Sequence, residues 1–176
     1  MSTDQDTSLS KTLEALGITP GNYRALLLLP LVYVAWADRK MEDVEVDRIH
    51  QIAKHRLYMR PEAMSIVKGW LTKAPDKEHF LAGLQELFLL AQTEQGEPLV
   101  DSEDLQELLL HAEAIARATA DALDSPTAVT AEEEEALTDI ARILGVDNGR
   151  SWRRLLDELD AGPASIHAGR ASSGGR

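Results

Sequence analysis

Acidic residues in two stretches of the chain are the strongest candidates for chemistry. Asp38 follows an apolar run, Asp43, Glu45 and Asp47 come soon after it, and Glu133 stands in a second acidic stretch. Carboxylates and the free carbonyl groups of helix ends are the hard oxygen ligands that Ca²⁺ and Mg²⁺ prefer. With a tight turn after Asp38, Glu45 would lie beside it. The sequence therefore predicts a divalent cation, Ca²⁺ or Mg²⁺, on these carboxylates.

Helix capping is the alternative role for the same side chains. The segment Thr130-Ala-Glu-Glu133 matches the S/T-x-x-E capping box, in which the glutamate accepts a hydrogen bond from the backbone N–H of the capping residue. Glu45 could do the same for a cap at Glu42. Asp38 could cap a turn or pair with one of the two basic residues that follow it.

Charge is distributed unevenly along the chain, whose formal net charge is -12. Residues 21–74 hold nine basic and six acidic side chains, whereas residues 97–147 hold two basic and fourteen acidic ones. Such asymmetry favours attraction of cations or of a partner with a basic surface. We therefore predict that Glu132, Glu134 and Glu135 bind a basic protein partner. Solvated helix faces are the alternative explanation of these charges.

Composition and motifs argue against several other functions. The acidic balance disfavours nucleic-acid binding, because neutralised phosphates supply most of that affinity. No cysteine is present, which excludes disulfides, thiol nucleophiles and thiolate zinc sites. The sequence has no P-loop, no dinucleotide fingerprint and no G-x-S-x-G motif. We predict a non-catalytic protein; the abundance of carboxylates keeps an enzyme as the third option.

Helical periodicity runs through the chain, and no stretch alternates like a strand. We predict an all-α bundle of seven or eight helices, with residues 1–8 as a flexible N-terminus, residues 9–160 as one domain and residues 161–176 as a disordered tail. The expected helices begin near residues 9, 20, 43, 61, 76, 101, 130 and 152.

The second predicted helix runs from Thr19-Pro20, as N-cap and first helical residue, to about Asp38. It is apolar on every side, so it should lie at the centre of the bundle. Pro30 should kink it. Gly17 and Gly145 should end the helices that precede them.

Two segments are similar when they are aligned with each other. In one, Met41 precedes Glu45 by four residues and Ile49 follows by four; in the other, Val129 and Leu137 flank Glu133 at the same spacing. An apolar helix comes before each segment. The sequence therefore predicts a helix, a tight turn and a helix, used twice.

At Ala35-Trp-Ala37-Asp38-Arg-Lys-Met41-Glu-Asp-Val-Glu45 the chain resembles the TerB-like family, to which tellurite-resistance proteins belong. The resemblance covers residues 23–146. It implies a helical fold with a pseudo-twofold internal repeat, and paired acidic clusters that bind a divalent metal. It further implies an adaptor or sensor in a stress-response complex, possibly at the cytoplasmic face of the membrane.

The chain departs from the family pattern at two places. Arg39 stands where the family has glycine, so a residue suited to positive φ is missing and a cation stands beside Asp38. The second copy lacks the Asp-Gly pair.

The N-terminal residues are polar and acidic, unlike a signal peptide, and the longest apolar run, 25–37, is too short to cross a bilayer. We therefore expect a cytoplasmic protein without a transmembrane segment.

Overall fold

The computed structural model describes residues 11–92, 100–118 and 129–146. The chain divides into two units, Met1–Val146 and Asp147–Arg176, and every described residue belongs to the first. The predicted flexible N-terminus, the eighth helix near residue 152 and the disordered tail all lie outside the described residues.

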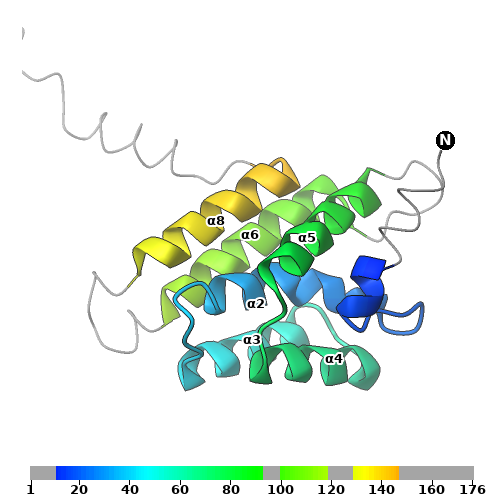
Figure 1. Ribbon diagram of the computed structural model, residues 1–176, viewed down its shortest axis with the longest axis horizontal. Coiled ribbons are helices and arrows are strands. Elements are labelled where there is room, and N and C mark those ends of the chain that lie inside the picture. The colour runs from blue at the N-terminus through cyan, green and yellow to red at the C-terminus, as the bar shows by residue number, and fades with distance from the viewer. Residues whose placement is uncertain (1–10, 93–99, 119–128, 147–176) are drawn as a thin grey trace, which may run out of the picture. The chain divides into compact units, whose positions relative to one another are not determined.

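The described residues form helices and no strand, which confirms the all-α prediction. A first short helical stretch covers residues 11–15. The elements that follow it in the described part of the chain are labelled in Figure 1 where there is room. They are the 3₁₀ helix η1 (Tyr23–Leu28) and the α-helices α2 (Leu29–Ala35), α3 (Asp43–His55), α4 (Pro61–Thr72), α5 (Lys77–Ala91), α6 (Ser102–Ala116) and α8 (Ala131–Leu144).

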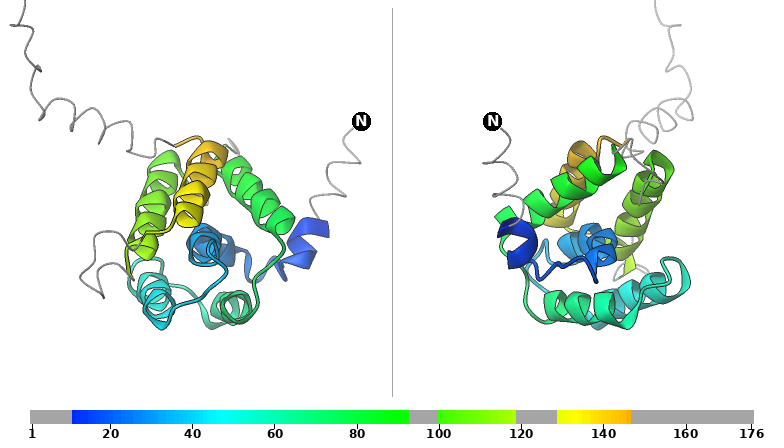
Figure 2. Two further views of the ribbon diagram at one scale, coloured as in Figure 1. Left: turned by 60° about the vertical axis from the view of Figure 1, so that its left-hand side comes forward. Right: turned by 90° about the vertical axis from the view of Figure 1, so that its right-hand side faces the viewer.

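Helix α2 lies at the centre of the first unit. Every residue from Leu29 to Ala35 is buried. Figure 2 (left) shows α2 nearly end-on, with α3, α4, α5, α6 and α8 around it, and α2 packs against each of these helices. A helix that is apolar on all sides needs neighbours on all sides, so the central position predicted from composition is confirmed.

The start of the predicted second helix is wrong. Residues 18–22 form a turn, in which the backbone N–H of Thr19 donates to Asn22 Oδ1 at 2.7 Å. Asn22 Nδ2 in turn donates to the carbonyl oxygen of Gly17 at 3.1 Å. The Asn22 side chain thus closes a turn with backbone groups that precede Pro20, and the first helical residue is Tyr23.

Where the sequence predicted a kink at Pro30 within one helix, the structure has a boundary between two helical elements, η1 and α2. The 3₁₀ helix η1 ends at Leu28, and Pro30 stands in the first turn of α2. A proline at that position has no N–H to lose from the helix, so the α-helical part begins just before it. Helix α2 ends at Ala35, which leaves Trp36, Ala37 and Asp38 in a turn.

Helix ends elsewhere follow the sequence signals. Pro61 begins α4, Thr130 caps α8, and Gly17 and Gly145 have φ values of 76° and 62°, as their roles as helix stops predict. The amino-terminal part of α8 lies near the turn that follows α2, since Glu132 and Asp38 line the same hollow.

Candidate functional site

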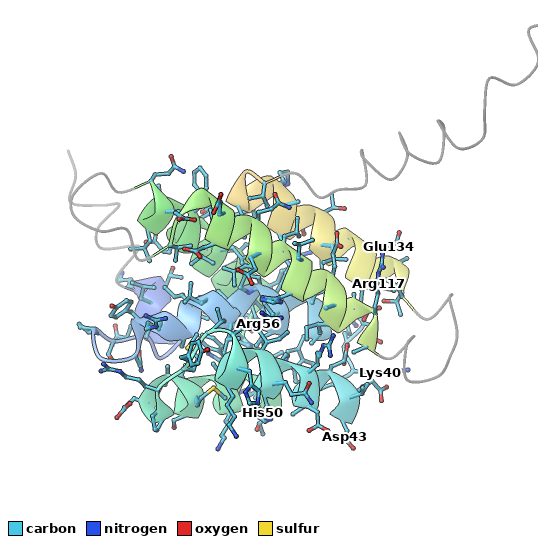
Figure 3. The ribbon with its side chains drawn as sticks, turned by 180° about the vertical axis from the view of Figure 1, so that it is seen from behind. Lys40, Asp43, His50, Arg56, Arg117 and Glu134 are labelled. Carbon is cyan, nitrogen blue, oxygen red and sulfur yellow. The ribbon has the colours of Figure 1, made fainter. Side chains whose placement is uncertain are left out.

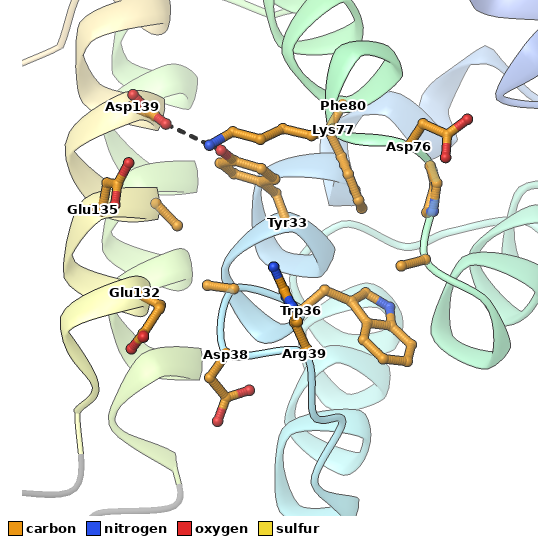
Figure 4. A pocket seen from close by; sticks show the side chains of 14 residues that line it. Tyr33, Trp36, Asp38, Arg39, Asp76, Lys77, Phe80, Glu132, Glu135 and Asp139 are labelled. Carbon is orange, nitrogen blue, oxygen red and sulfur yellow. Dashed lines mark hydrogen bonds between the residues drawn. The ribbon is translucent and has the colours of Figure 1, made fainter.

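A groove of about 840 Å³ lies where the carboxyl end of α2, the first half of α8 and the amino end of α5 come together. Figure 4 shows it from close by. Side chains from three separate stretches of sequence line it: Tyr33, Trp36, Ala37, Asp38 and Arg39; Ala74, Pro75, Asp76, Lys77 and Phe80; and Glu132, Glu135, Ala136 and Asp139.

The groove carries an excess of negative charge. Its lining contains five carboxylates, from Asp38, Asp76, Glu132, Glu135 and Asp139, against two cations, from Arg39 and Lys77. Three of the carboxylates come from α8, where residues 132, 135 and 139 lie three and four apart and therefore share one face. Both glutamates are exposed, and neither forms an ion pair within the described part of the chain.

Three aromatic side chains give the groove an apolar part. The rings of Tyr33 and Phe80 pack with their centroids 5.2 Å apart. Trp36 is half-buried and its indole Nε1 donates to the carbonyl oxygen of Trp70 at 2.8 Å, which fixes the orientation of the ring. The groove therefore combines aromatic faces with carboxylates, a combination suited to cationic side chains with long apolar stems.

Asp139 is the carboxylate of the groove that bonds to an aromatic side chain of its wall. The hydroxyl of Tyr33 donates to Asp139 Oδ2 at 3.1 Å, and Arg142 Nη2 lies 3.0 Å from Asp139 Oδ1. Burial, together with the negative charge of Asp139, raises the pKa of Tyr33, so its hydroxyl stays protonated and remains a donor. Asp139 thus holds the aromatic wall in place.

Glu45 and Glu133 act as helix caps. Glu45 Oε2 accepts from the backbone N–H of Glu42 at 2.9 Å, and Glu133 Oε2 accepts from the backbone N–H of Thr130 at 2.7 Å. Thr130 Oγ1 accepts in return from the N–H of Glu133 at 3.2 Å. The capping interpretation of both glutamates is confirmed.

The same two glutamates are the buried charged residues of the described chain, with exposed fractions of 2% and 4%. Burial raises the pKa of Glu45 to about 7, and the negative charges of Glu133 and Asp38 contribute to the rise. The pKa of Glu133 is also raised, first by burial and further by Asp38 and Glu132. The structure thus brings Asp38, Glu45 and Glu133 into one electrostatic neighbourhood.

The other predicted metal ligands lie elsewhere. Asp43 and Asp47 are exposed on α3, and neither contributes to the raised pKa of Glu45. Within the described residues, no three histidine, aspartate or glutamate side chains lie in an arrangement that could hold a metal ion. Asp38, Glu45 and Glu133 do not form such a group, although Asp38 contributes to the raised pKa of both glutamates, and metal binding stays a prediction.

The turn between α2 and α3 has an unusual backbone conformation. Asp38 Oδ1 accepts from the backbone N–H of Lys40 at 2.9 Å, so the turn-capping interpretation of this residue is confirmed. Arg39, between them, has φ of 65°, a left-handed conformation that costs about 1–2 kcal/mol for a residue with a Cβ. The backbone has kept a conformation suited to glycine at a position occupied by arginine.

We expect Arg39→Gly to stabilise the protein by about 0.5–1 kcal/mol, because glycine adopts positive φ without the steric cost but loses more entropy on folding. Urea unfolding at neutral pH measures the change. Lys40→Gly, at an adjacent residue that has no positive φ, should destabilise the protein. An Arg39→Gly variant no more stable than the parent would contradict the strain argument.

The structure separates the predicted partner-binding residues. Glu132 and Glu135 line the groove, whereas Glu134 does not. The sequence analysis missed Asp139, although its helical spacing from Glu135 was a usable signal. It also missed Asp76, which comes from the connection before α5 and carried no local signal.

Comparisons with protein families, with curated proteins and with solved structures found no match. No helix among the described residues is long and apolar enough to span a membrane.

Proposed function

We propose that the protein is a non-catalytic TerB-like helical module, of the tellurite-resistance and stress-response type, that acts as an adaptor. Its groove binds a basic, amphipathic segment of a protein partner. The observation that supports this proposal is the lining of the groove, in which five carboxylates surround three aromatic rings and outnumber the two cations. The resemblance in sequence adds a stress-response complex at the cytoplasmic face of the membrane as the proposed setting.

The chemistry of the groove defines the partner. Lys and Arg side chains have apolar stems that pack on aromatic faces while the charged heads reach carboxylates. A cation within reach of an aromatic face gains about 0.5–2 kcal/mol, depending on how far it is desolvated. The exposed glutamates of α8 supply the long-range attraction that increases the rate of encounter.

Binding of a fluorescein-labelled peptide of alternating Lys and Leu tests the proposal. Glu132→Gln/Glu135→Gln should weaken binding at least about tenfold, since two exposed charges at the contact are lost. Added salt should weaken binding to the parent protein, and a chelator should not. The matched control Glu62→Gln/Glu103→Gln removes the same net charge from the first turns of α4 and α6, outside the groove. Equal weakening in both double variants would contradict the proposal.

A divalent cation is the second candidate ligand, with a sensor role. The observation that favours it is the neighbourhood of Asp38, Glu45 and Glu133, in which each glutamate is buried and has its pKa raised by nearby negative charge. A cation there would neutralise that repulsion. The capping hydrogen bonds use one oxygen of each glutamate, Oε2 in both cases.

Thermal unfolding at pH 7.5 with Ca²⁺, Mg²⁺ or Mn²⁺ tests the cation. At a hundredfold excess over the dissociation constant, the midpoint should rise by about 5–10 °C. Asp38→Asn and Glu45→Gln should abolish the rise, whereas Asp43→Asn, on the exposed face of α3, should keep it. No rise with any of the three ions would remove the metal proposal and leave the peptide groove unaffected.

A further inference from the structure

A second hollow, of about 400 Å³, lies between α3 and α6 and has the opposite character to the groove. Figure 3 shows this side of the molecule and labels Arg56 near the end of α3. The side chains from α3 recur every three or four residues, so they form one stripe that faces α6. The lining consists of Arg48, Gln51, Ile52, His55 and Arg56 from α3 and of His111 and Ala114 from α6.

The lining of this hollow contains two guanidinium groups, two imidazoles and no carboxylate. Within the described residues, neither Arg48 nor Arg56 forms an ion pair. In a chain with 30 acidic residues and a net charge of -12, two unpaired arginines on one short stripe stand out. We call this set of residues the basic pocket.

His111 lies at the inner side of the basic pocket. Its Nε2 atom is buried, and Glu107 Oε1 lies 3.4 Å from it. Burial lowers the pKa of His111, and Arg56 and Arg48 lower it further against the opposing effect of Glu107. The positive charges of both guanidinium groups therefore disfavour protonation of the His111 imidazole.

Helix electrostatics account for only part of this charge. Basic residues near the carboxyl end of a helix interact favourably with its macrodipole, which explains His55 and Arg56. The effect fades within the last turn, and Arg48 lies two turns earlier. The dipole therefore does not account for Arg48, whose guanidinium group lies on the same stripe of side chains as His55.

We propose that the basic pocket binds a small phosphate-bearing anion, with Arg48 and Arg56 on the phosphate oxygens and His111 as a further hydrogen-bond partner. Guanidinium groups donate paired N–H bonds that match phosphate geometry. The volume exceeds that of a phosphate group, so the anion can be free phosphate or a small phosphate monoester. This site is separate from the acidic groove, shares no residue with it and does not depend on the proposed adaptor function.

Titration of the chain with inorganic phosphate and with ribose 5-phosphate, followed by NMR of the histidine side chains, tests the proposal. We expect saturable shifts of His111 and His55 with at least one of the two. Equal affinities would assign recognition to the phosphate group alone, and tighter binding of ribose 5-phosphate would assign a role to the rest of the pocket.

Substitutions distinguish binding of the anion in the basic pocket from a general attraction of the anion to basic residues. Arg48→Gln/Arg56→Gln should weaken binding at least about tenfold, because both bidentate donors are lost. The control Lys54→Gln/Lys68→Gln removes the same charge from α3 and α4 outside the pocket and should leave the affinity unchanged. Glu107→Gln should tighten binding several-fold, since it removes the carboxylate beside His111.

Two results would overturn the proposal. One is the absence of saturable shifts at His111 with both anions, in a sample whose far-ultraviolet circular dichroism shows folded helices. The other is equal weakening in the Arg48→Gln/Arg56→Gln variant and in the lysine control.

Discussion

Glu45→Gln is expected to make the protein more stable than the parent by about 2 kcal/mol at pH 8 in the absence of divalent ions. The glutamine keeps an oxygen that can accept from the Glu42 N–H, but it removes a charge that is buried at 2% exposure beside Asp38 and Glu133. Burial of that charge is the reason the pKa of Glu45 rises from 4.5 to about 7.

The sign of the pH dependence follows from the direction of that shift. Because the folded protein holds the Glu45 proton more tightly than the unfolded chain, the contribution of Glu45 to stability is fully present below pH 4.5. It is lost as the pH rises towards 7, where the folded-state carboxyl group ionises. The parent and the variant should therefore differ little in stability at pH 4.5 and most at pH 8.

Urea unfolding of both proteins across this pH range measures the effect. Glu62→Gln, which removes an exposed glutamate from the first turn of α4, should instead lower stability slightly at pH 8 by weakening the helix-dipole interaction. A Glu45→Gln variant that is less stable than the parent at pH 8 would contradict this account, because it would show that neighbouring groups of the protein stabilise the buried carboxylate.

Glu132→Lys/Glu135→Lys should weaken binding of the Lys-Leu peptide by about hundredfold, which corresponds to about 2.7 kcal/mol. The substitution changes the groove from five carboxylates and two cations to three carboxylates and four cations. The basic peptide would then meet repulsion where it now meets attraction. Fluorescence polarisation at constant ionic strength measures both affinities.

The charge-reversal variant Glu132→Lys/Glu135→Lys needs a control that changes the net charge by the same amount at residues outside the groove. Glu62→Lys/Glu103→Lys changes the net charge equally and also places lysine in the first turns of two helices, where cations are unfavourable. We expect it to retain most of the affinity, since both residues lie outside the groove. An equal loss in this control would mean that net charge, and not the groove, attracts the peptide.

Local signals in the sequence were sufficient to predict most helix ends. Thr130 and Glu133 form the predicted capping box, and Gly145 ends α8 at positive φ, because these interactions join residues only a few positions apart. The central position of α2 was also predictable, since a helix without a polar face must be surrounded. The start of η1 was not predictable from the Thr19-Pro20 signal, because the side chain of Asn22 bonds to backbone groups of Gly17 and Thr19 and closes a turn before the helix.

The candidate sites could be predicted only in part. Glu132 and Glu135 were identified from the charge of their helix, but their meeting with Trp36 and Asp76 depends on how α5 and α8 pack against α2. Paired acidic clusters were expected only from the resemblance to the TerB-like family, and of the predicted ligands Asp43 and Asp47 face solvent. Spacing along one helix predicts which residues share a face, but it does not predict which residues of other helices that face contacts.

The most direct test of the adaptor proposal is NMR mapping of where the Lys-Leu peptide binds on the folded chain. The largest shift changes are predicted at the Trp36 indole N–H, which donates to the Trp70 carbonyl at the groove, and at the amides of Glu132 and Glu135. Changes concentrated away from these three residues, for example along α4, would contradict the account, and so would a spectrum that the peptide leaves unaltered.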